Sequence, residues 1–344
     1  MEHHEYDELK DRIERLEASV GNATGTLEDF MGSFIEQLEK QKELLKDVEF
    51  LRRYAGNARY EVADPRVIKY KYPKFFSYEE TIRLIREEGA SLARFGDGEF
   101  ALMQGIQRYG FQRADERLAK RLREVVCSNE EGMLIGIADN FGDLSRYNWE
   151  AQAGIRRYMK ENVRAFLDQI IDENKTYVDA YLTRFYVIYA DNKGSGPAER
   201  LEMLRSMWEG RDVLIVEGAL SRLGVGNDLF MNVNSLRRIL VPTHNVFDRY
   251  DDILCGIRKE VNKGELVLLA AGPSAGIFAY DLRGDGIQAL DVGHVDIEYE
   301  WFLKGQGKRC PVPGKFIGEV AGGEEVEDIM NLQYEREIVR DYSK

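Results

Sequence analysis

The chain has 344 residues, of which 44% are hydrophobic, enough to bury the core of one large domain or two smaller ones. Its formal net charge of −13 argues against a nucleic-acid backbone as partner. Its three cysteines (Cys127, Cys255 and Cys310) are far apart and indicate reduced thiols without a zinc motif. The apolar runs are too short to span a bilayer and no signal peptide is visible, so we expect a cytoplasmic protein without a transmembrane segment.

Residues 1–54 are predicted to form a helical arm. Apolar side chains recur with the 4-3-4 spacing of a coiled-coil seam at Leu9, Ile13, Leu16 and Val20. The glycines in residues 21–25 predict a break, after which a second apolar run continues to residue 51. Such a seam suits a homo-oligomer or a docking arm, although a helix folded back on its own domain would show the same pattern.

Residues 55–76 contain two prolines and are predicted to be a loop-like linker. The main domain is then expected over residues 77–344, where Ser77 and Glu80 form a capping box that opens a helix. Predicted strands and helices alternate over residues 78–303, which indicates an α/β, Rossmann-like fold: a mainly parallel sheet with helices on both faces. The polar C-terminal tail is predicted to end in a charged helix over residues 326–339.

The strongest chemical signal is residues 91–100, a short apolar strand followed by Gly-Asp-Gly-Glu. Gly96 would permit a tight loop, on which Asp97 and Glu99 lie two residues apart. Paired carboxylates suit Mg²⁺ or Mn²⁺, whose shell substrate phosphates commonly complete, and Arg94 could pair with a phosphate. The alternative is an ordinary acidic turn.

Further polar residues follow other predicted strands. A turn of glycine, proline and serine after the most apolar strand would let a phosphate approach the N-terminus of a helix. Gly272 and Asp291 are 19 residues apart, near the spacing at which nucleotide folds place a ribose-binding acid. Because ligands bind beyond the carboxyl ends of parallel strands, we expect these groups to converge on one site. They are Arg184, Glu217, Arg222, Asn227, Asp228, Gly272, Pro273, Ser274, Asp291, His294, Asp296 and Glu298.

Four segments in series resemble the GT-D-type glycosyltransferases, bacterial enzymes that glycosylate surface proteins and polysaccharides. The matching segments are residues 94–100, 216–230, 271–274 and 291–301, and the resemblance covers roughly residues 77–303. The family implies a Rossmann-like fold, a nucleotide-sugar donor, typically a UDP-sugar, and a divalent metal served by an Asp-x-Glu motif. That motif matches Asp97 and Glu99, whereas the arm lies outside the resemblance.

The resemblance therefore implies transfer of a sugar from a nucleoside-diphosphate sugar to the hydroxyl of a glycan, glycolipid or glycoprotein, in the cytoplasm or at the inner face of the membrane. Mn²⁺ or Mg²⁺ at Asp97 and Glu99 would neutralise the leaving diphosphate. His294 is a candidate third metal ligand or a base. An inverting enzyme would also need a general base, for which the candidates are Asp296, Glu298, Glu217 and Asp228. Arg94, Arg184 and Arg222 would contact the donor phosphates.

Two alternatives remain open on the sequence. A methyltransferase or another Rossmann-type enzyme could use residues 266–291 for a different nucleotide cofactor, but the Gly-Asp-Gly-Glu segment would then have no role. A degenerate, non-catalytic transferase could act as a binding module through its arm. Intact Asp97 and Glu99 argue against that second alternative.

Overall fold

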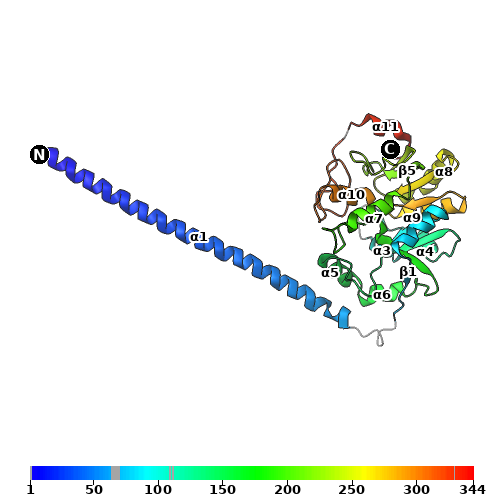
Figure 1. The fold of residues 1–344 in the computed structure, drawn as a ribbon, viewed down its shortest axis with the longest axis horizontal. Coiled ribbons are helices and arrows are strands. Elements are labelled where there is room, and N and C mark those ends of the chain that lie inside the picture. Colours follow the sequence, from blue (N-terminus) through cyan, green and yellow to red (C-terminus); the bar gives the residue numbers. More distant parts are fainter. Residues whose placement is uncertain (1, 63–69, 108–109, 111, 329) are drawn as a thin grey trace. The chain divides into compact units, whose positions relative to one another are not determined.

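A computed structural model describes residues 2–62, 70–107, 110, 112–328 and 330–344, with the backbone alone for residues 2–7, 23, 49–50 and 52–62 (Figure 1). The chain divides into two compact units, residues 1–68 and 69–344. Part of the predicted linker, including Pro65, lies outside the described residues. None of the helices in the described part of the chain is long and apolar enough to cross a membrane.

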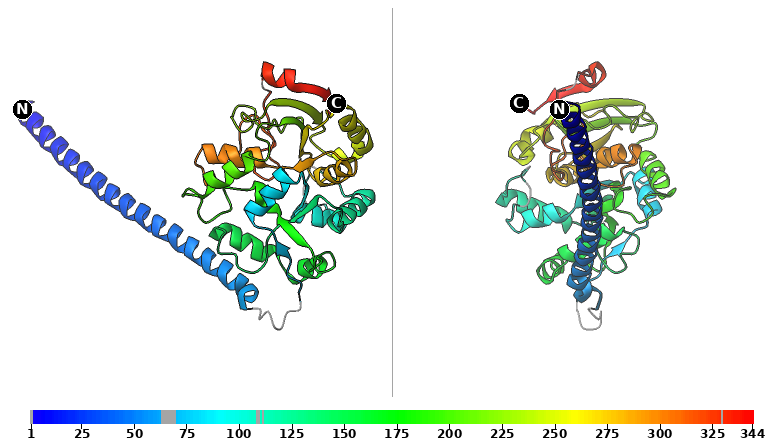
Figure 2. Two further views of the ribbon diagram at one scale, coloured as in Figure 1. Left: turned by 45° about the vertical axis from the view of Figure 1, so that its right-hand side comes forward. Right: turned by 90° about the vertical axis from the view of Figure 1, so that its left-hand side faces the viewer.

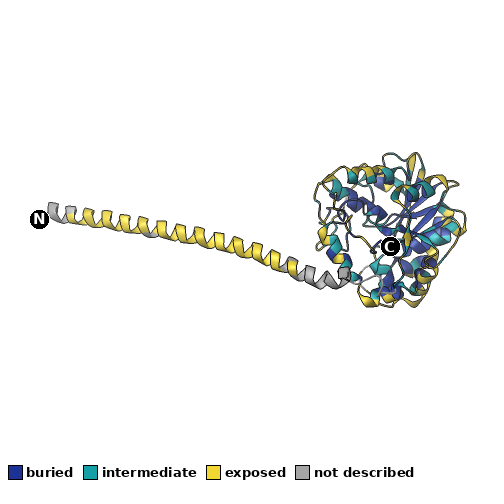
Figure 3. Cartoon of the chain, turned by 60° about the horizontal axis from the view of Figure 1, so that its bottom comes forward, coloured by how far each residue is buried: buried dark blue, intermediate teal, exposed yellow. Residues whose placement is uncertain are grey.

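The first unit is one uninterrupted helix, α1 (Glu2–Val62), so the break predicted at residues 21–25 is wrong. Gly21, Gly25 and Gly32 each cost the helix about 1 kcal/mol relative to alanine, which a helix of this length tolerates. The helix also continues beyond residue 54 into the segment predicted as linker. Every side chain of α1 that the structure describes is exposed (Figure 3).

The second unit is built on a sheet that, within the described residues, has nine strands in the order β1-β4-β3-β2-β8-β7-β5-β6-β9. Every pair of neighbouring strands is parallel, which confirms the predicted α/β fold with a parallel sheet. The strands are β1 (Lys74–Phe75), β2 (Ser91–Phe95), β3 (Met133–Ile137), β4 (Thr176–Asp179), β5 (Asp212–Gly218), β6 (Ser235–Val241), β7 (Leu266–Ala270), β8 (Ala289–Asp291) and β9 (Ile338–Asp341).

Helices connect these strands and cover both faces of the sheet. They are α2 (Tyr78–Glu87), α3 (Asp97–Met103), α4 (Glu116–Val126), α5 (Trp149–Tyr158), α6 (Glu161–Leu167), α7 (Gly196–Arg205), α8 (Tyr250–Glu260), α9 (Ser274–Gly284), α10 (Val295–Leu303) and α11 (Leu332–Glu337), with 3₁₀ turns at Ala180–Thr183 and Val246–Arg249. The main core cluster holds Leu92 together with side chains of α2, α7 and α10. The next residue, Ala93, points to the opposite face, where α9 packs against it at Gly276.

Both edges of the sheet differ from the sequence prediction. β1 lies within the segment predicted as linker and pairs with β4. At the other edge the predicted charged helix over residues 326–339 is wrong, because only α11 is helical there and β9 follows it, paired with β6 (Figure 2). The alternating burial of β9, which is polar and half-exposed, is typical of an edge strand and gave little apolar signal in the sequence.

The chain reverses its direction across the sheet between β2 and β8. From β2 it proceeds outward through β3 and β4, whereas β5 to β8 fill the other half and return to lie beside β2. This switch point is where open parallel sheets bind ligands, beyond the carboxyl ends of the strands. Asp97 and Glu99 follow β2 and Asp291 ends β8, so all three acids are at this point.

Candidate functional site

Asp97 and Glu99 lie in the first turn of α3, not on the loop that the sequence predicted. Gly96 caps this helix with φ −114°, a conformation open to any residue, and its N–H donates to Glu99 Oε2 at 2.8 Å. The helix dipole stabilises acidic side chains in a first turn, which accounts for a helix starting directly at this motif. The capping bond also fixes the Glu99 carboxylate at the end of β2.

The electrostatics of Glu99 join the motif to β8. Burial raises the pKa of Glu99 to about 7, opposed by the backbone N–H groups of Gly96 and of Glu99 itself. The neighbouring charges of Asp291 and Asp97 raise it further. The three carboxylates predicted to converge here therefore lie close enough for Asp97 and Asp291 both to act on Glu99.

Arg94, at the end of β2, is already engaged within the protein. Its Nη2 donates to Asp291 Oδ1 at 2.7 Å and its Nε to the Asp291 carbonyl oxygen at 2.8 Å, while Nη1 donates to Thr183 Oγ1 at 2.9 Å. Burial raises the pKa of Asp291 despite this guanidinium. Arg94 thus orients Asp291, and the predicted contacts of both with the donor stay predictions. Gly293 is required beside them, because its φ is +46° and a Cβ would lie 2.1 Å from Arg94 Nη2.

A second group of charges comes from α10, the segment after β4 and the C-terminal tail. Arg184 Nη2 donates to Glu319 Oε1 at 2.7 Å, and Arg309 Nη1 donates to Glu319 Oε2 at 3.0 Å. His294 Nε2 lies 3.7 Å from Glu319 Oε1. Burial raises the pKa of Glu319, but Arg184, His294 and Arg309 outweigh it and hold that pKa at about 2. The tail therefore brings an anion into a group of cations next to the switch point.

His294 and Glu298 both face Arg184. Burial lowers the pKa of the half-buried His294, and Arg184 and Arg94 lower it further against the opposing charge of Glu319. With its pKa lowered to about 4, the ring is neutral at pH 7 and only weakly basic, which disfavours the role of general base and leaves that of metal ligand open. Glu298 is fully buried, accepts from the Val187 N–H at 3.0 Å, and lies 3.7 Å from Arg184 Nη1. Neither Arg184 Nη1 nor Glu298 Oε1 has a hydrogen-bond partner among the described residues.

The turn before α9 packs directly against β2. Gly272 has φ +55°, and a Cβ on Gly276 would lie 3.7 Å from the Arg94 carbonyl oxygen. Pro273 caps α9, and Ser274 is fully buried with no hydrogen-bond partner for its hydroxyl within the described chain. The N-terminus of α9 is thus next to the Asp-x-Glu motif, as predicted, although Ser274 is shielded from solvent.

The predicted residues after β5 form a separate, closed network. Glu217 is fully buried and accepts from Arg238 Nη1 at 2.6 Å and from the Leu223 N–H at 2.7 Å. Burial raises the pKa of Glu217, opposed by Arg238. Arg222, with φ +50°, donates to the carbonyl oxygens of Gly314 and Glu327 at 2.8 and 2.7 Å. These contacts hold the glycine-rich loop and the tail in place.

Asp296 and Asn227 complete that network. Asp296 Oδ1 accepts from Asn227 Nδ2 and from the Gly224 N–H, both at 2.8 Å, and Oδ2 accepts from Lys315 Nζ at 2.6 Å. Asp228 accepts a short hydrogen bond from the Tyr299 hydroxyl, which lowers its pKa. Both carboxylate oxygens of Asp296 and of Glu217 are thus buried and hydrogen-bonded. This arrangement favours a structural role over the predicted role as general base.

The sequence interpretation missed several residues near the site. Asp139 and Asp179 follow β3 and β4, and the Asp139 N–H donates to Asp179 Oδ1 at 3.0 Å. Burial, together with Asp139, raises the pKa of Asp179 to about 6. The strand-end rule that selected Asp97 would have found both. Arg309, Lys315 and Glu319 lie in the irregular tail, where no periodic pattern pointed to them.

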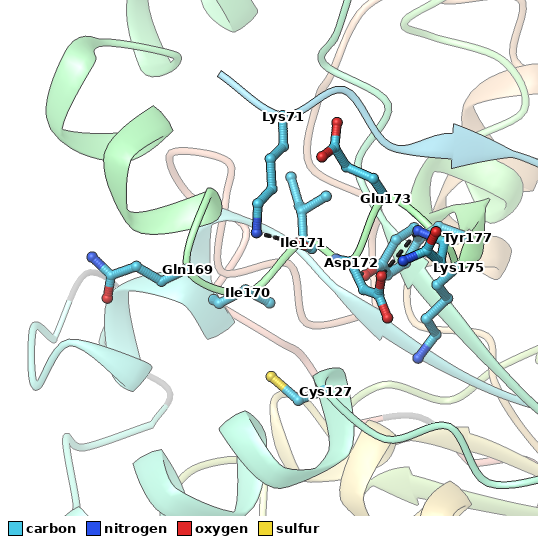
Figure 4. A pocket seen from close by; sticks show the side chains of 10 residues that line it. Lys71, Cys127, Gln169, Ile170, Ile171, Asp172, Glu173, Lys175 and Tyr177 are labelled. Atoms are coloured by element: carbon cyan, nitrogen blue, oxygen red, sulfur yellow. Dashed lines mark hydrogen bonds between the residues drawn. The ribbon is translucent and has the colours of Figure 1, made fainter. Parts of the chain in front are cut away.

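Two depressions differ in their relation to this site. One of about 370 Å³, lined by residues such as Lys71, Cys127 and Lys175, lies where the chain enters β4, the amino end of the strand and so the edge opposite the acids (Figure 4). The other, of about 610 Å³, is lined by tail residues that include Arg309, Glu319 and Glu325. Because Glu319 contacts Arg184, this second depression adjoins the candidate site.

The donor set at the switch point fits a metal ion that other ligands help to hold. Among the described residues, no group of three or more His, Cys, Asp and Glu side chains is arranged to hold one. Asp97 and Glu99 nevertheless fit a site with two protein carboxylates, since hard divalent cations take oxygen ligands and commonly complete their shell with water and substrate phosphates. Burial is the main cause of the raised pKa of Glu99, and the charges of Asp291 and Asp97 add to it; a bound cation would oppose both effects by favouring the ionised carboxylate.

Comparison with known proteins agrees with this arrangement. Residues 92–320 match the family "Glycosyltransferase GT-D fold". The chain is 33% identical over 264 residues to "Probable glycosyl transferase Gly" of Streptococcus gordonii and 34% identical over 265 residues to "Glycosyltransferase GlyD" of Streptococcus pneumoniae serotype 4 (strain ATCC BAA-334 / TIGR4). Each alignment covers 76% of this chain, but only 38% and 31% of those relatives, so the chain spans about a third of their length.

A solved structure, described as "The highly conserved domain of unknown function 1792 has a distinct glycosyltransferase fold", superposes with a TM-score of 0.73 at 34% identity. The superposition covers 78% of this chain and 96% of that structure. The family match over residues 92–320 and this superposition lead to the same conclusion. This chain belongs to the GT-D-fold family of glycosyltransferases.

Proposed function

We propose that the chain transfers a sugar from a nucleoside-diphosphate sugar, a UDP-sugar by the family resemblance, to an acceptor hydroxyl in bacterial surface glycan or glycoprotein synthesis. The observation that supports it best is the placement of Asp97 and Glu99 directly after β2 and of Asp291 at the end of the neighbouring β8, which brings three carboxylates to the switch point. Such a cluster suits a divalent cation and the diphosphate that would share it. The relatives named as glycosyltransferases support the same reaction class.

Asp97 and Glu99 would hold Mn²⁺ or Mg²⁺, with His294 as a candidate third ligand. Bound there, the cation would neutralise the negative charge that grows on the leaving diphosphate. Glu99 is oriented for this by the Gly96 N–H, and Asp291, oriented by Arg94, would accept from a ribose hydroxyl. The reaction would take place in the cytoplasm or at the inner face of the membrane.

Arg184 and Arg309 would bind the diphosphate oxygens. Both now share the Glu319 carboxylate, which a diphosphate could replace as their anionic partner. Arg309 is solvent-exposed beside the 610 Å³ depression, so a donor could reach it from that side. Charge-assisted contacts of guanidinium with phosphate oxygen are strong and directional.

The test is a binding panel on the full chain, monitored by thermal shift and calorimetry. UDP-, GDP-, dTDP- and CMP-sugars are compared, each with and without Mn²⁺. A rise in melting temperature with one nucleotide class, larger with Mn²⁺, is expected because a ligand that binds only the folded state stabilises it. A rise with S-adenosylmethionine or NAD instead would support another Rossmann-type enzyme, and no rise with any ligand would favour a non-catalytic module.

A further inference from the structure

The apolar side chains that the structure describes along α1 are all exposed. Those large enough to form a core are between 42% and 68% exposed, among them Leu9, Leu38 and Leu44. Monomeric proteins rarely leave so long a continuous apolar stripe in water. We therefore expect a binding partner to cover this stripe, and the sequence of α1 indicates which partner.

A single heptad register runs through the helix without interruption. When Ile13 is placed at position a, all the core positions of the described side chains are apolar except two glutamines. Position a is then occupied by Ile13, Val20, Leu27, Phe34, Gln41 and Val48, and position d by Leu9, Leu16, Phe30, Gln37, Leu44 and Leu51. Gly21, Gly25 and Gly32 fall at the outer b and f positions, where a Cβ would have no other atom within 4 Å.

We propose that α1 pairs with α1 of a second copy of this chain as a parallel, in-register, two-stranded coiled coil. The first two heptads have β-branched Ile13 and Val20 at position a and leucines at position d. That combination favours two parallel strands over three or four. Beyond them, Met31, Leu38 and Leu45 at position e would extend the buried seam on each helix.

The glutamines specify the direction of pairing. In a parallel pair Gln37 meets Gln37 and Gln41 meets Gln41 of the other copy, so each amide can hydrogen-bond to its equivalent. An antiparallel pairing of the whole helix would instead place Gln37 against the apolar Leu27 layer. A buried polar side chain without a partner is costly, so the parallel arrangement is favoured.

The charges beside the seam agree with the same pairing. In a parallel coiled coil, position g of one helix faces position e of the other, five residues later. Arg12 then faces Glu17 of the second copy, an opposite-charge pair that occurs twice in the dimer. Lys40 faces Leu45, whose side chain its methylene groups can cover. Among the described side chains of α1, no two like charges meet in this register.

Sedimentation of the full chain tests the proposal. Wild type is expected at twice the mass of one chain, and Ile13→Glu with Val20→Glu at the mass of one, because two charges would be buried in the seam. Ala18→Glu with Gly25→Glu is the matched control, since it adds the same two charges, also seven residues apart, at outer position f and should stay dimeric. A monomeric wild type, an assembly of three or four chains, or dimers that survive the double substitution would overturn the proposal.

Two variants test the register. Arg12→Glu is expected to weaken the dimer by about tenfold, and combining it with Glu17→Arg should restore it, since the pair is reversed. Val20→Cys should form a disulfide between equivalent residues, identified as the cross-linked peptide by mass spectrometry, whereas Ala18→Cys should not. Absence of the Val20→Cys link, or no rescue by the charge reversal, would exclude the parallel register. Donor binding is measured in parallel and should not change, so this test is independent of the proposed reaction.

Discussion

The ends of β2 and β5 carry similar sequence signals but different structures. Both strands are apolar, and both are followed by glycines mixed with acids. After β2, Asp97 and Glu99 are half-buried, and the charges of Asp97 and Asp291 both act on Glu99. After β5, Glu217 and the acids it approaches are buried and paired with cations and backbone N–H groups. The same pattern of glycines and acids can therefore form a candidate functional site or a buried structural network. The contacts that the acids make in the folded chain distinguish the two.

The largest effect is expected from Asp97→Asn. Removing a carboxylate that would hold the divalent cation should lower sugar transfer by about a thousandfold, measured as donor turnover with Mn²⁺. The melting temperature should change little, because Asp97 is only half-buried. Glu79→Gln, on an exposed position of α2, is the control and should leave turnover unchanged. Full activity of Asp97→Asn would contradict the proposed metal site at the end of β2.

The opposite result is expected in the second region. Asp296→Asn deprives the buried Lys315 of its 2.6 Å partner and should destabilise the fold by about 3 kcal/mol, measured by urea denaturation. Replacing Lys315 by Met in the same chain should recover much of that loss, because the buried ammonium, which then has only Glu300 at 3.1 Å as an ionic partner, is removed. If the Asp296→Asn chain is instead stable but inactive, Asp296 has a catalytic role and not a structural one.

Asp139 follows β3 and Asp179 is the last residue of β4. The pH dependence of stability tests whether Asp179 is buried as the structure shows. The pKa of Asp179 is raised to about 6, so the folded state holds its proton more tightly than the unfolded state. Its contribution to stability is therefore full below about pH 4 and falls as the pH rises through 6, by about 3 kcal/mol. Asp179→Asn should flatten the unfolding free energy across this window, and an unchanged slope would contradict the burial of Asp179.

The smallest effect is expected at Arg309. Arg309→Ala should weaken binding of the nucleoside diphosphate by about tenfold, with the weakening reduced at high salt because the contact is electrostatic. Lys308→Ala, an exposed cation one residue away, should have a much smaller effect. Equal effects of the two would mean that the tail contributes only general charge.

Much of the fold could be predicted because strands of a parallel sheet are strongly apolar. β5 and β7 were recognised from continuous runs of Leu, Val and Ile, and Ser77 caps α2 as expected. β1 and β9 were missed because an edge strand buries little and shows no such run. The continuity of α1 was missed because glycine penalties are local, whereas a helix of 61 residues is stabilised along its whole length.

The site was predictable where it depended on strand ends and not where it depended on partners. Asp97, Glu99 and Asp291 converge as expected because β2 and β8 are neighbours. No pattern in the sequence distinguishes Asp296, which is bound by Lys315, from an accessible acid. Glu319 reaches Arg184 from 135 residues away along an irregular segment, a contact that only the folded chain defines.

The pairing of β2 with β8 has a consequence for biosynthesis. Leu92 in β2 can pair with Leu290 in β8 only after Leu290 has been synthesised, about 10–40 s after Leu92 at ordinary elongation rates. During that interval β2 offers an open apolar edge to other nascent chains and to chaperones. Asp97 and Glu99 therefore meet Asp291 only after β8 has been synthesised, so a chain that terminates before β8 would lack the third acid of the switch point.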